Sequence, residues 1–131
     1  MKESVVSGES AASVMYVSDR YFKVWAYTVS HCRLLLRSTR GSSAETRIDV
    51  HFSAVSSLLL RPYYDGLKIR RGREIEYDEV ERICGDRPMP GRLYVLGEDL
   101  TSFVVSAEPQ WHEDHGSHSD PSWFGHMVGT A

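Results

Sequence analysis

The sequence has few of the features that anchor or cross-link a chain. Its longest unbroken aliphatic runs are two leucine triplets, at 34–36 and 58–60, whereas a membrane-spanning helix needs about 20 apolar residues. A membrane helix is therefore not expected. The two cysteines, Cys32 and Cys84, lie far apart in apolar-flanked stretches, which predicts reduced, buried thiols rather than a disulfide framework or a metal knuckle.

Motifs of the common enzyme classes are also missing. The chain has no glycine-rich phosphate loop, no HExxH helix and no GxSxG nucleophile elbow. Asp49 with His51, and His112 with Asp114, have the composition of acid–base couples, but neither pair has an identifiable nucleophile. The absence of motifs leaves the question of an enzyme open, and we expect a protein without catalytic residues.

The composition is that of one ordinary globular domain. Its 131 residues are enough to bury a core, and 41% of them are apolar and 25% charged. Residues 1–17 are rich in serine, which predicts a flexible leader, and residues 18–131 are expected to form a single β-rich domain with an aromatic and histidine-rich tail from 108. The N-terminus lacks the apolar segment of a secretory signal, which predicts a cytoplasmic protein.

Charge is divided unevenly along the chain. Residues 20–73 carry eleven Lys and Arg against three Asp and Glu, whereas residues 74–131 carry three against twelve. This split indicates either two parts of one fold that neutralise each other or a basic surface that binds an anionic partner. The sequence pI near 6.0 makes nucleic acid an unlikely partner.

The clearest strand signal is the alternation over residues 46–53. Ile48, Val50 and Phe52 point to one side, and the polar residues between them point to the other, which predicts one core face and one solvated face. The phase is lost at 54–55, as a bulge or a corner between two strands would produce.

Other segments complete the predicted fold. Asp65-Gly66 predicts a tight turn, and a helical stripe with a capping-box spacing predicts one short helix between Glu74 and Cys84. The short connections require antiparallel pairing, so we expect a mainly β fold, a single antiparallel β-sandwich or partly open barrel of about six strands with one short helix. Further strands are predicted at 21–29, 32–38, 67–70, 93–96 and 101–107.

Two groups of polar residues are candidate sites. The first is the polar side of the middle strands, where arginines suited to carboxylate or phosphate recognition would lie beside an acid and an imidazole. Its members are Arg33, Arg37, Arg47, Asp49 and His51. The second is the tail, where three imidazoles recur at intervals of three and offer enough ligands for zinc or nickel. Its members are His112, His115 and His118. A polar tail without a metal is the alternative, since neither a helix nor a strand aims all three at one ion.

The runs Thr46–Phe52 and Tyr64–Ile69, preceded by Trp25–Arg37, resemble small bacterial β-rich proteins. Some of those proteins come from high-GC soil bacteria and others are encoded near toxin–immunity loci. The resemblance extends over residues 21–124. It implies a β-rich fold and a bacterial cytoplasmic setting, and it implies no catalytic residues.

These observations favour a non-enzymatic protein-interaction module. It would bind a protein partner, or a second copy of itself as a homodimer, through a sheet face or edge together with the aromatic tail. The alternative is a small-ligand or metal-binding protein that uses the polar sheet face or the histidine-rich tail. In the first case the basic and acidic parts of the chain are expected to pair with each other.

Overall fold

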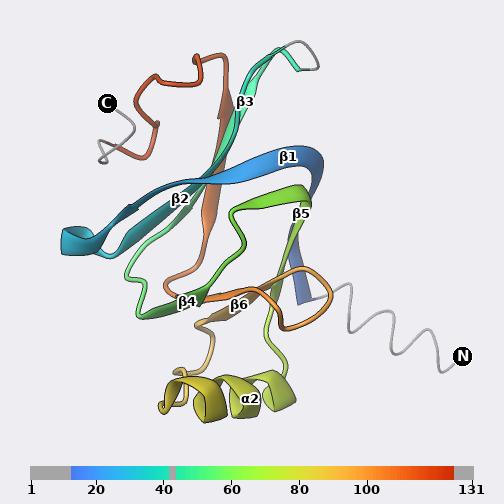
Figure 1. Cartoon of the computed structure of the whole chain (residues 1–131), viewed down its shortest axis with the longest axis vertical. Coiled ribbons are helices and arrows are strands. Elements are labelled where there is room, and N and C mark those ends of the chain that lie inside the picture. Colours follow the sequence, from blue (N-terminus) through green and yellow to red (C-terminus); the bar gives the residue numbers. More distant parts are fainter. Residues whose placement is uncertain (1–12, 42–43, 126–131) are drawn as a thin grey trace, which may run out of the picture.

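In the part of the chain that the structure describes, the fold consists of one curved antiparallel sheet of eight strands and one α-helix (Figure 1). The computed structural model describes residues 13–41 and 44–125. The strand order across the sheet is β4-β7-β6-β5-β1-β2-β3-β8. The strands are β1 (Val14–Thr28), β2 (Arg33–Ser38), β3 (Arg47–Phe52), β4 (Ser57–Leu59), β5 (Tyr63–Arg71), β6 (Leu93–Leu96), β7 (Phe103–Val105) and β8 (Gln110–Asp114), and the helices are the 3₁₀ turn η1 (Val29–His31) and α2 (Glu74–Cys84).

The longest strand, β1, connects the two halves of the sheet. Its residues up to Lys23 pair with β5, and its residues from Lys23 onward pair with β2. The ladders are interrupted between Ser18 and Tyr21 and between Val24 and Ala26. Because a bulge adds a residue and increases the local twist, β1 bends along its length and the sheet curls over on itself (Figure 1).

The two ends of the sheet are brought round by a second bend. β3 and β4 are consecutive in the chain, and so are β7 and β8, so the β3–β8 and β4–β7 pairs are two arms of one bent ladder. Between the arms, the Ala107 N–H donates to the Ser53 carbonyl and the Ser56 N–H donates to the Val105 carbonyl, both at 2.9 Å. Ala54, with φ of 51°, marks the corner that the loss of phase predicted. The result is a partly open barrel, which confirms the predicted fold class. The corner that separates β3 from β4 and β7 from β8 explains why the structure has eight strands rather than the six or so expected.

Side chains rather than backbone bonds connect β1 to β8. Tyr16 packs on Trp111 with their ring centroids 4.8 Å apart. The Arg20 guanidinium donates to the Thr46 hydroxyl at 3.0 Å and lies 4.0 Å from the Glu113 carboxylate. The N-terminal half of β1 therefore lies beside β8 without a hydrogen-bonded ladder between them.

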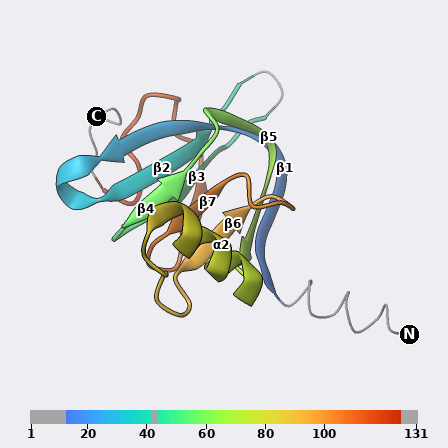
Figure 2. The ribbon, with the colours of Figure 1, turned by 60° about the horizontal axis from the view of Figure 1, so that its bottom comes forward.

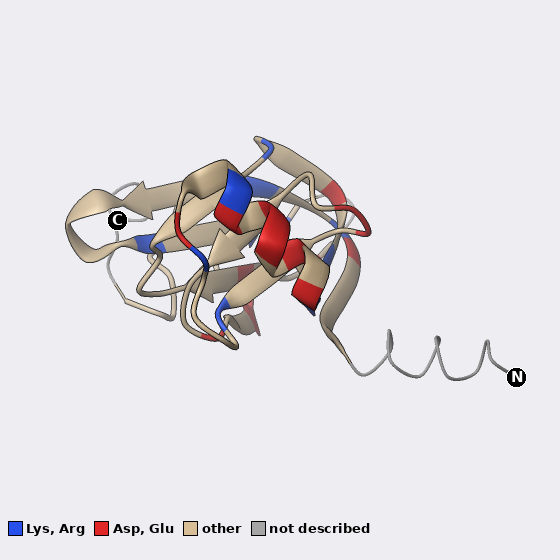
Figure 3. Cartoon of the chain, turned by 90° about the horizontal axis from the view of Figure 1, so that it is seen from below, with Lys and Arg blue, Asp and Glu red and all other residues tan. Residues whose placement is uncertain are grey.

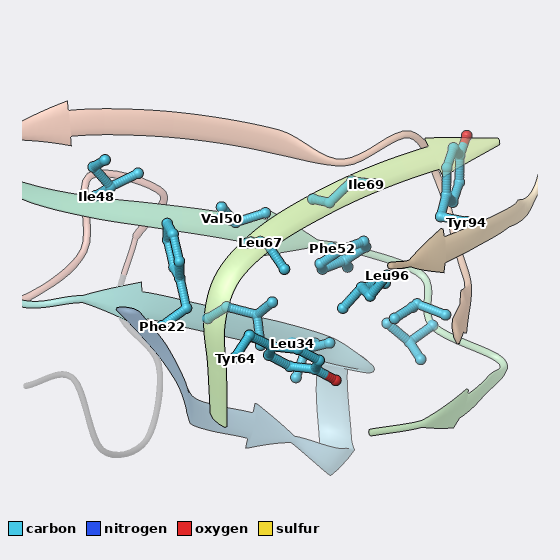
Figure 4. Close-up of a cluster of buried hydrophobic side chains, with 13 residues drawn as sticks. Phe22, Leu34, Ile48, Val50, Phe52, Tyr64, Leu67, Ile69, Tyr94 and Leu96 are labelled. Carbon is cyan, nitrogen blue, oxygen red and sulfur yellow. The ribbon is translucent and has the colours of Figure 1, made fainter. Parts of the chain in front are cut away.

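The main core fills the inside of the curled sheet (Figure 4). Ile48, Val50 and Phe52 of β3 all point into it, as the alternation predicted. Phe22 from β1 and Leu34 from β2 are fully buried beside them. Each such side chain contributes about 1.5–3 kcal/mol on transfer from water, so this core is the main source of stability.

The opposite face of β3 is buried as well, which corrects the predicted solvated face. Arg47, Asp49 and His51 expose only 3%, 1% and 6% of their surface. Alternation of apolar and polar residues normally indicates that one face meets water. Here the chain after β8 folds back over that face (Figure 1). The polar side chains of the face are therefore buried against polar groups of that segment, such as the main-chain carbonyls of His118 and Asp120.

Helix α2 forms where the sequence predicted it, and it lies across one end of the sheet (Figure 2). Val80 packs on the side chains of β6 and β7 in a second, smaller core. Glu76 receives two bonds from Arg70, at 2.8 and 2.7 Å, and one from the Arg73 N–H at 2.8 Å. Burial acts to raise the pKa of Glu76, but these bonds outweigh it and lower the pKa to about 2. The carboxylate thus fixes the first turn of the helix to β5.

Several predicted boundaries shift. β1 begins at Val14, so residues 14–17 belong to the sheet rather than to the leader, because Tyr16 packs against Trp111 and Phe22. Residues 1–12 of the leader lie outside the described residues. The start of the expected tail is strand β8, whose residues pair with β3. The turn predicted at Asp65-Gly66 lies inside β5, where Gly66 has φ of +90° opposite the interruption in β1.

The two cysteines are free thiols. Cys32 is half-buried, whereas Cys84 is exposed rather than buried, because it ends α2 just before the Gly85 cap. No helix in the described ranges has the length and hydrophobicity to cross a membrane.

Candidate functional site

The five residues predicted as an anion-binding face lie together. Register pairing places Arg37 opposite Asp49 and Leu35 opposite His51, so the side chains of alternate β2 residues share one side of the sheet with those of β3. We call this set of Arg33, Arg37, Arg47, Asp49 and His51 the arginine face.

Arg37 and Asp49 form a fully buried ion pair at its centre. Arg37 Nε and Nη2 donate to the two Asp49 carboxylate oxygens at 2.7 and 3.0 Å. Neither side chain exposes more than 1% of its surface. The guanidinium also lies 5.2 Å from the ring centroid of Trp25, a cation–π distance. Because a buried charge without a partner is very costly, each member requires the other.

Arg47 and Asp114 form the second pair, which links β3 to the end of β8. Arg47 Nε and Nη2 donate to the two carboxylate oxygens, both at 2.9 Å. Burial acts to raise the pKa of Asp114, but the Arg47 bonds and the Gly116 N–H at 3.0 Å outweigh it and hold the pKa below its usual value. Gly116 lies so close that a Cβ there would be 2.6 Å from Arg47 Cζ.

The segment that covers the arginine face is residues 115–124, which we call the strap. Arginines hold it through its main-chain carbonyl oxygens. The contacts run from Arg33 to the Phe124 carbonyl at 2.7 Å, from Arg37 to that of His118 at 2.7 Å, from Arg40 to that of His115 at 2.8 Å, and from Arg47 to those of Ser117, Asp120 and Pro121 at 3.1, 2.8 and 3.2 Å. Hydrogen bonds to a charged donor are stronger than neutral ones, so six carbonyls fix the strap over the sheet.

His51 lies under the end of the strap in its neutral form. Its Nε2 accepts from Arg33 Nε at 3.0 Å, which leaves the proton on Nδ1. Nδ1 is buried and has no hydrogen-bond partner among the described residues. Phe124 stacks on the imidazole at a centroid distance of 4.9 Å. Burial lowers the pKa of His51 to about 4, and the Arg33 charge adds to that effect.

The three tail imidazoles have separate surroundings. His112 on β8 stacks on Trp123 with the ring centroids 4.5 Å apart. His118 meets the edge of Trp25 at 6.4 Å. The main-chain carbonyl of His115 accepts a hydrogen bond from Arg40, whereas no ring contact joins its imidazole to the other two among the described residues. Over residues 13–41 and 44–125, no cluster of three or more His, Cys, Asp or Glu is placed so that it could hold a metal ion.

The basic and acidic parts of the sequence neutralise each other within one chain. Arg47 pairs with Asp114, Arg70 with Glu76, Lys68 with Glu98 and Arg71 with Glu108. Another group of carboxylates lies on α2 (Figure 3), where Arg87 reaches three of them. The basic residues 33–47 are therefore not an open cationic surface, as a nucleic-acid partner would need.

A groove that the sequence did not predict runs along β5. Its volume is about 560 Å³. β5 pairs with β6 only at residues 69–71, so the edge of β5 from Tyr63 to Lys68 has no neighbouring strand in the described ranges on that side. The lining consists of Val17, Ser18, Arg61, Tyr63, Tyr64, Asp65, Gly66, Leu67, Lys68, Leu96, Gly97, Glu98, Asp99 and Thr101.

The groove wall carries exposed aromatic and charged side chains. Tyr63 exposes 53% of its surface and stacks on Tyr21 at 5.4 Å. Arg61, Asp65 and Asp99 form no ion pair with another described residue, so both signs of charge face this groove without a partner within 4 Å. The sequence held one signal for this free edge, because the strand predicted at 93–96 is too short to pair with all of β5. The expected turn at 65–66 concealed the signal, since it made the predicted strand before α2 short as well.

Comparison with known proteins gives no match: no protein-family model, no curated protein and no solved structure is similar to this chain. Function has to be inferred from the sites themselves.

Proposed function

We propose that this chain is a non-enzymatic protein-interaction module that binds an extended segment of a partner protein along the free edge of β5. The observation that carries the proposal is the groove beside an unpaired strand edge. Adding a strand to an exposed edge is a common mode of peptide recognition, because main-chain hydrogen bonds supply affinity and side-chain pockets supply specificity.

The direction of the backbone groups supports this mode. The Lys68 carbonyl accepts from the Gly97 N–H at 2.9 Å and so points away from β1. At the other end of the strand, the Val24 N–H of β1 donates to the Pro62 carbonyl at 2.9 Å, so alternation turns the backbone groups of Tyr63 and Asp65 towards the open edge. A segment laid in the groove would meet this row of donors and acceptors, as β6 does further along β5.

The side chains around the edge suit a polar, extended peptide. Tyr63 offers an exposed ring at the groove wall, and aromatic residues are enriched where proteins bind partners. Arg61 on one hand and Asp65 and Asp99 on the other provide both signs of charge. We expect the bound segment to carry charged side chains of both signs.

A peptide selection followed by NMR tests the proposal. Random peptides of about 12 residues, long enough to fill such an edge, are selected against the immobilised full chain. Selected peptides are then titrated into the ¹⁵N-labelled full chain. We expect the largest shifts at the amides of residues 63–68 and 97–101. Selection that yields no peptide shifting these amides would contradict the proposal.

A pair of matched variants gives the control. Val17→Arg places a large side chain on the groove wall at a position that is 66% exposed, so the fold is expected to tolerate it. It should weaken binding of the selected peptides by about tenfold or more. Val29→Arg makes the same change in η1, outside the groove and 76% exposed, and should leave binding unchanged. Equal binding by both variants counts against the groove.

A further inference from the structure

The arginine face holds a polypeptide, and it does so through groups that every polypeptide has. Arg33, Arg37, Arg40 and Arg47 donate to six main-chain carbonyl oxygens of the strap. Two of these arginines keep a carboxylate partner within the sheet or at the end of β8 and use their remaining N–H groups for the strap. The face therefore has the chemistry of a built binding site for the main chain of a segment that forms two turns, at residues 117–120 and 122–125.

Two side-chain contacts add selectivity for the strap itself. Phe124 stacks on His51, a side chain that is only 6% exposed and whose Nδ1 has no partner among the described residues. His118 meets the edge of Trp25. A segment lacking an aromatic residue at the Phe124 position would leave the His51 ring without this stacking contact.

On its N-terminal side the strap is joined to the sheet at the end of β8. It follows Asp114, which stays on Arg47 through its own two bonds, and Gly116 is the residue that passes over the guanidinium. Lifting residues 117–124 breaks five of the six carbonyl contacts and the ring contacts of His118, Trp123 and Phe124, but leaves the β3–β8 ladder intact. A segment held in this way can be exchanged for an identical one without unfolding the domain.

We propose that the arginine face accepts the strap of a second copy of this chain, which gives a reciprocal homodimer. Residues 117–124 can make the same contacts in the exchanged and unexchanged states, so no new recognition is required. A chain's own strap has an effective concentration of about millimolar, which keeps the wild-type chain mostly in the unexchanged form. Exchange therefore becomes visible when the chain's own strap is weakened. This site is separate from the β5 groove, and neither proposal depends on the other.

The first test uses a fluorescent synthetic peptide of residues 115–125 as the probe. It is titrated into the full wild-type chain and into a full-length Phe124→Ala variant, whose own strap has lost the His51 contact. We expect the variant to bind the peptide about tenfold more tightly than the wild type, because the competing strap is weaker. A Val29→Ala variant, altered at an exposed residue of η1, should behave as the wild type. Absence of binding to the Phe124→Ala chain overturns the proposal.

The second test mixes two full-length variants that complement each other. Phe124→Ala offers an accessible face, and Arg40→Glu offers an intact strap on a chain whose own exposed Arg40 contact to His115 is lost. Light scattering should find each variant monomeric alone and a one-to-one heterodimer in the mixture. Arg33→Glu, which removes the contact to the Phe124 carbonyl, is a second strap donor in case one variant folds poorly. A mixture that stays monomeric with both donors contradicts exchange.

Discussion

His51 shows how one side chain connects the charge of the arginine face to the position of the strap. In the folded chain it accepts a hydrogen bond from Arg33 and carries Phe124 on its ring. Protonation would place a positive charge beside Arg33 on a side chain that is only 6% exposed. Asp49 lies close enough to favour the charged form, but its carboxylate is already bound by Arg37. The folded state therefore holds His51 neutral.

The pH dependence of stability follows from that pKa. The pKa of His51 is about 4 in the folded chain and near 6.5 when unfolded, so the unfolded state binds more protons between these values. Stability should fall as the pH drops from about 6.5 towards 4, by about 1–2 kcal/mol between pH 7 and pH 5. Urea unfolding of the wild type and of His51→Gln measures this difference, and the variant should lose the dependence.

An exposed histidine provides the control for this measurement. His31 lies in η1 and is exposed, so His31→Gln should keep the wild-type pH dependence. If the free energy of unfolding of His51→Gln and of His31→Gln depends on pH in the same way as that of the wild type, other groups cause the loss of stability. The conclusion that the folded state holds His51 neutral would then be wrong.

At the scale of elements, the strap and β8 behave as one C-terminal unit packed on β3. β8 supplies the ladder and Asp114, and the strap supplies carbonyls for the arginine side chains. The close passage of Gly116 over the Arg47 guanidinium is what allows both contacts to be made by the same arginine.

A methyl group at that passage should disturb the unit. In Gly116→Ala the new Cβ would lie 2.6 Å from Arg47 Cζ, and Arg47 is buried with its N–H groups in hydrogen bonds, so the strap or the guanidinium must shift. We expect a loss of about 1–3 kcal/mol in the free energy of unfolding, as in other overpacked sites. Thermal unfolding by circular dichroism measures it.

Gly41→Ala is the matched substitution, because a Cβ at Gly41 would have nothing within 4 Å. It should leave the unfolding temperature within the range of ordinary surface changes. A Gly116→Ala chain as stable as Gly41→Ala would mean that the strap does not pass where the structure places it.

Most helices and strands could be predicted from local sequence, whereas the distant segments that pack over them could not. The alternation at Ile48, Val50 and Phe52 identified the core side of β3, and the stripe around Val80 identified α2 within its observed bounds. Periodicity says which residues share a face, but not what covers that face. The strap is held through carbonyl oxygens, which leave no signature in residue types.

The same limit applies to the candidate sites. The arginine face was assembled correctly from strand pairing, since Arg37 and Asp49 are direct neighbours across β2 and β3. Its burial was missed because the partners come from residues about 70–80 positions away, as for Arg47 with Asp120. The β5 groove was missed because Gly66 was taken as a turn, whereas its positive φ is accommodated inside the strand.

For the whole molecule, the uneven charge of the sequence is resolved inside the fold. Arginines of β2 and β3 meet carboxylates and carbonyls from the same chain, and the acidic helix α2 is paired with Arg87 from the loop that follows it. The basic segment is thus part of the architecture rather than an open docking surface. This leaves the unpaired edge of β5 and its groove, with charged side chains of both signs, as the surface where we propose that a partner binds.

Solvent exchange of the arginine Nε–H groups, followed by ¹⁵N NMR, tests directly whether the strap covers the arginine face. Arg37 and Arg47 donate their Nε–H to Asp49 and Asp114 under the strap and should exchange far more slowly than Arg61, which has no ion pair among the described residues. Slow exchange at these two arginines, with fast exchange at Arg61, is the predicted result. Exchange of all three at the rate of a free arginine would show that the strap does not cover the face.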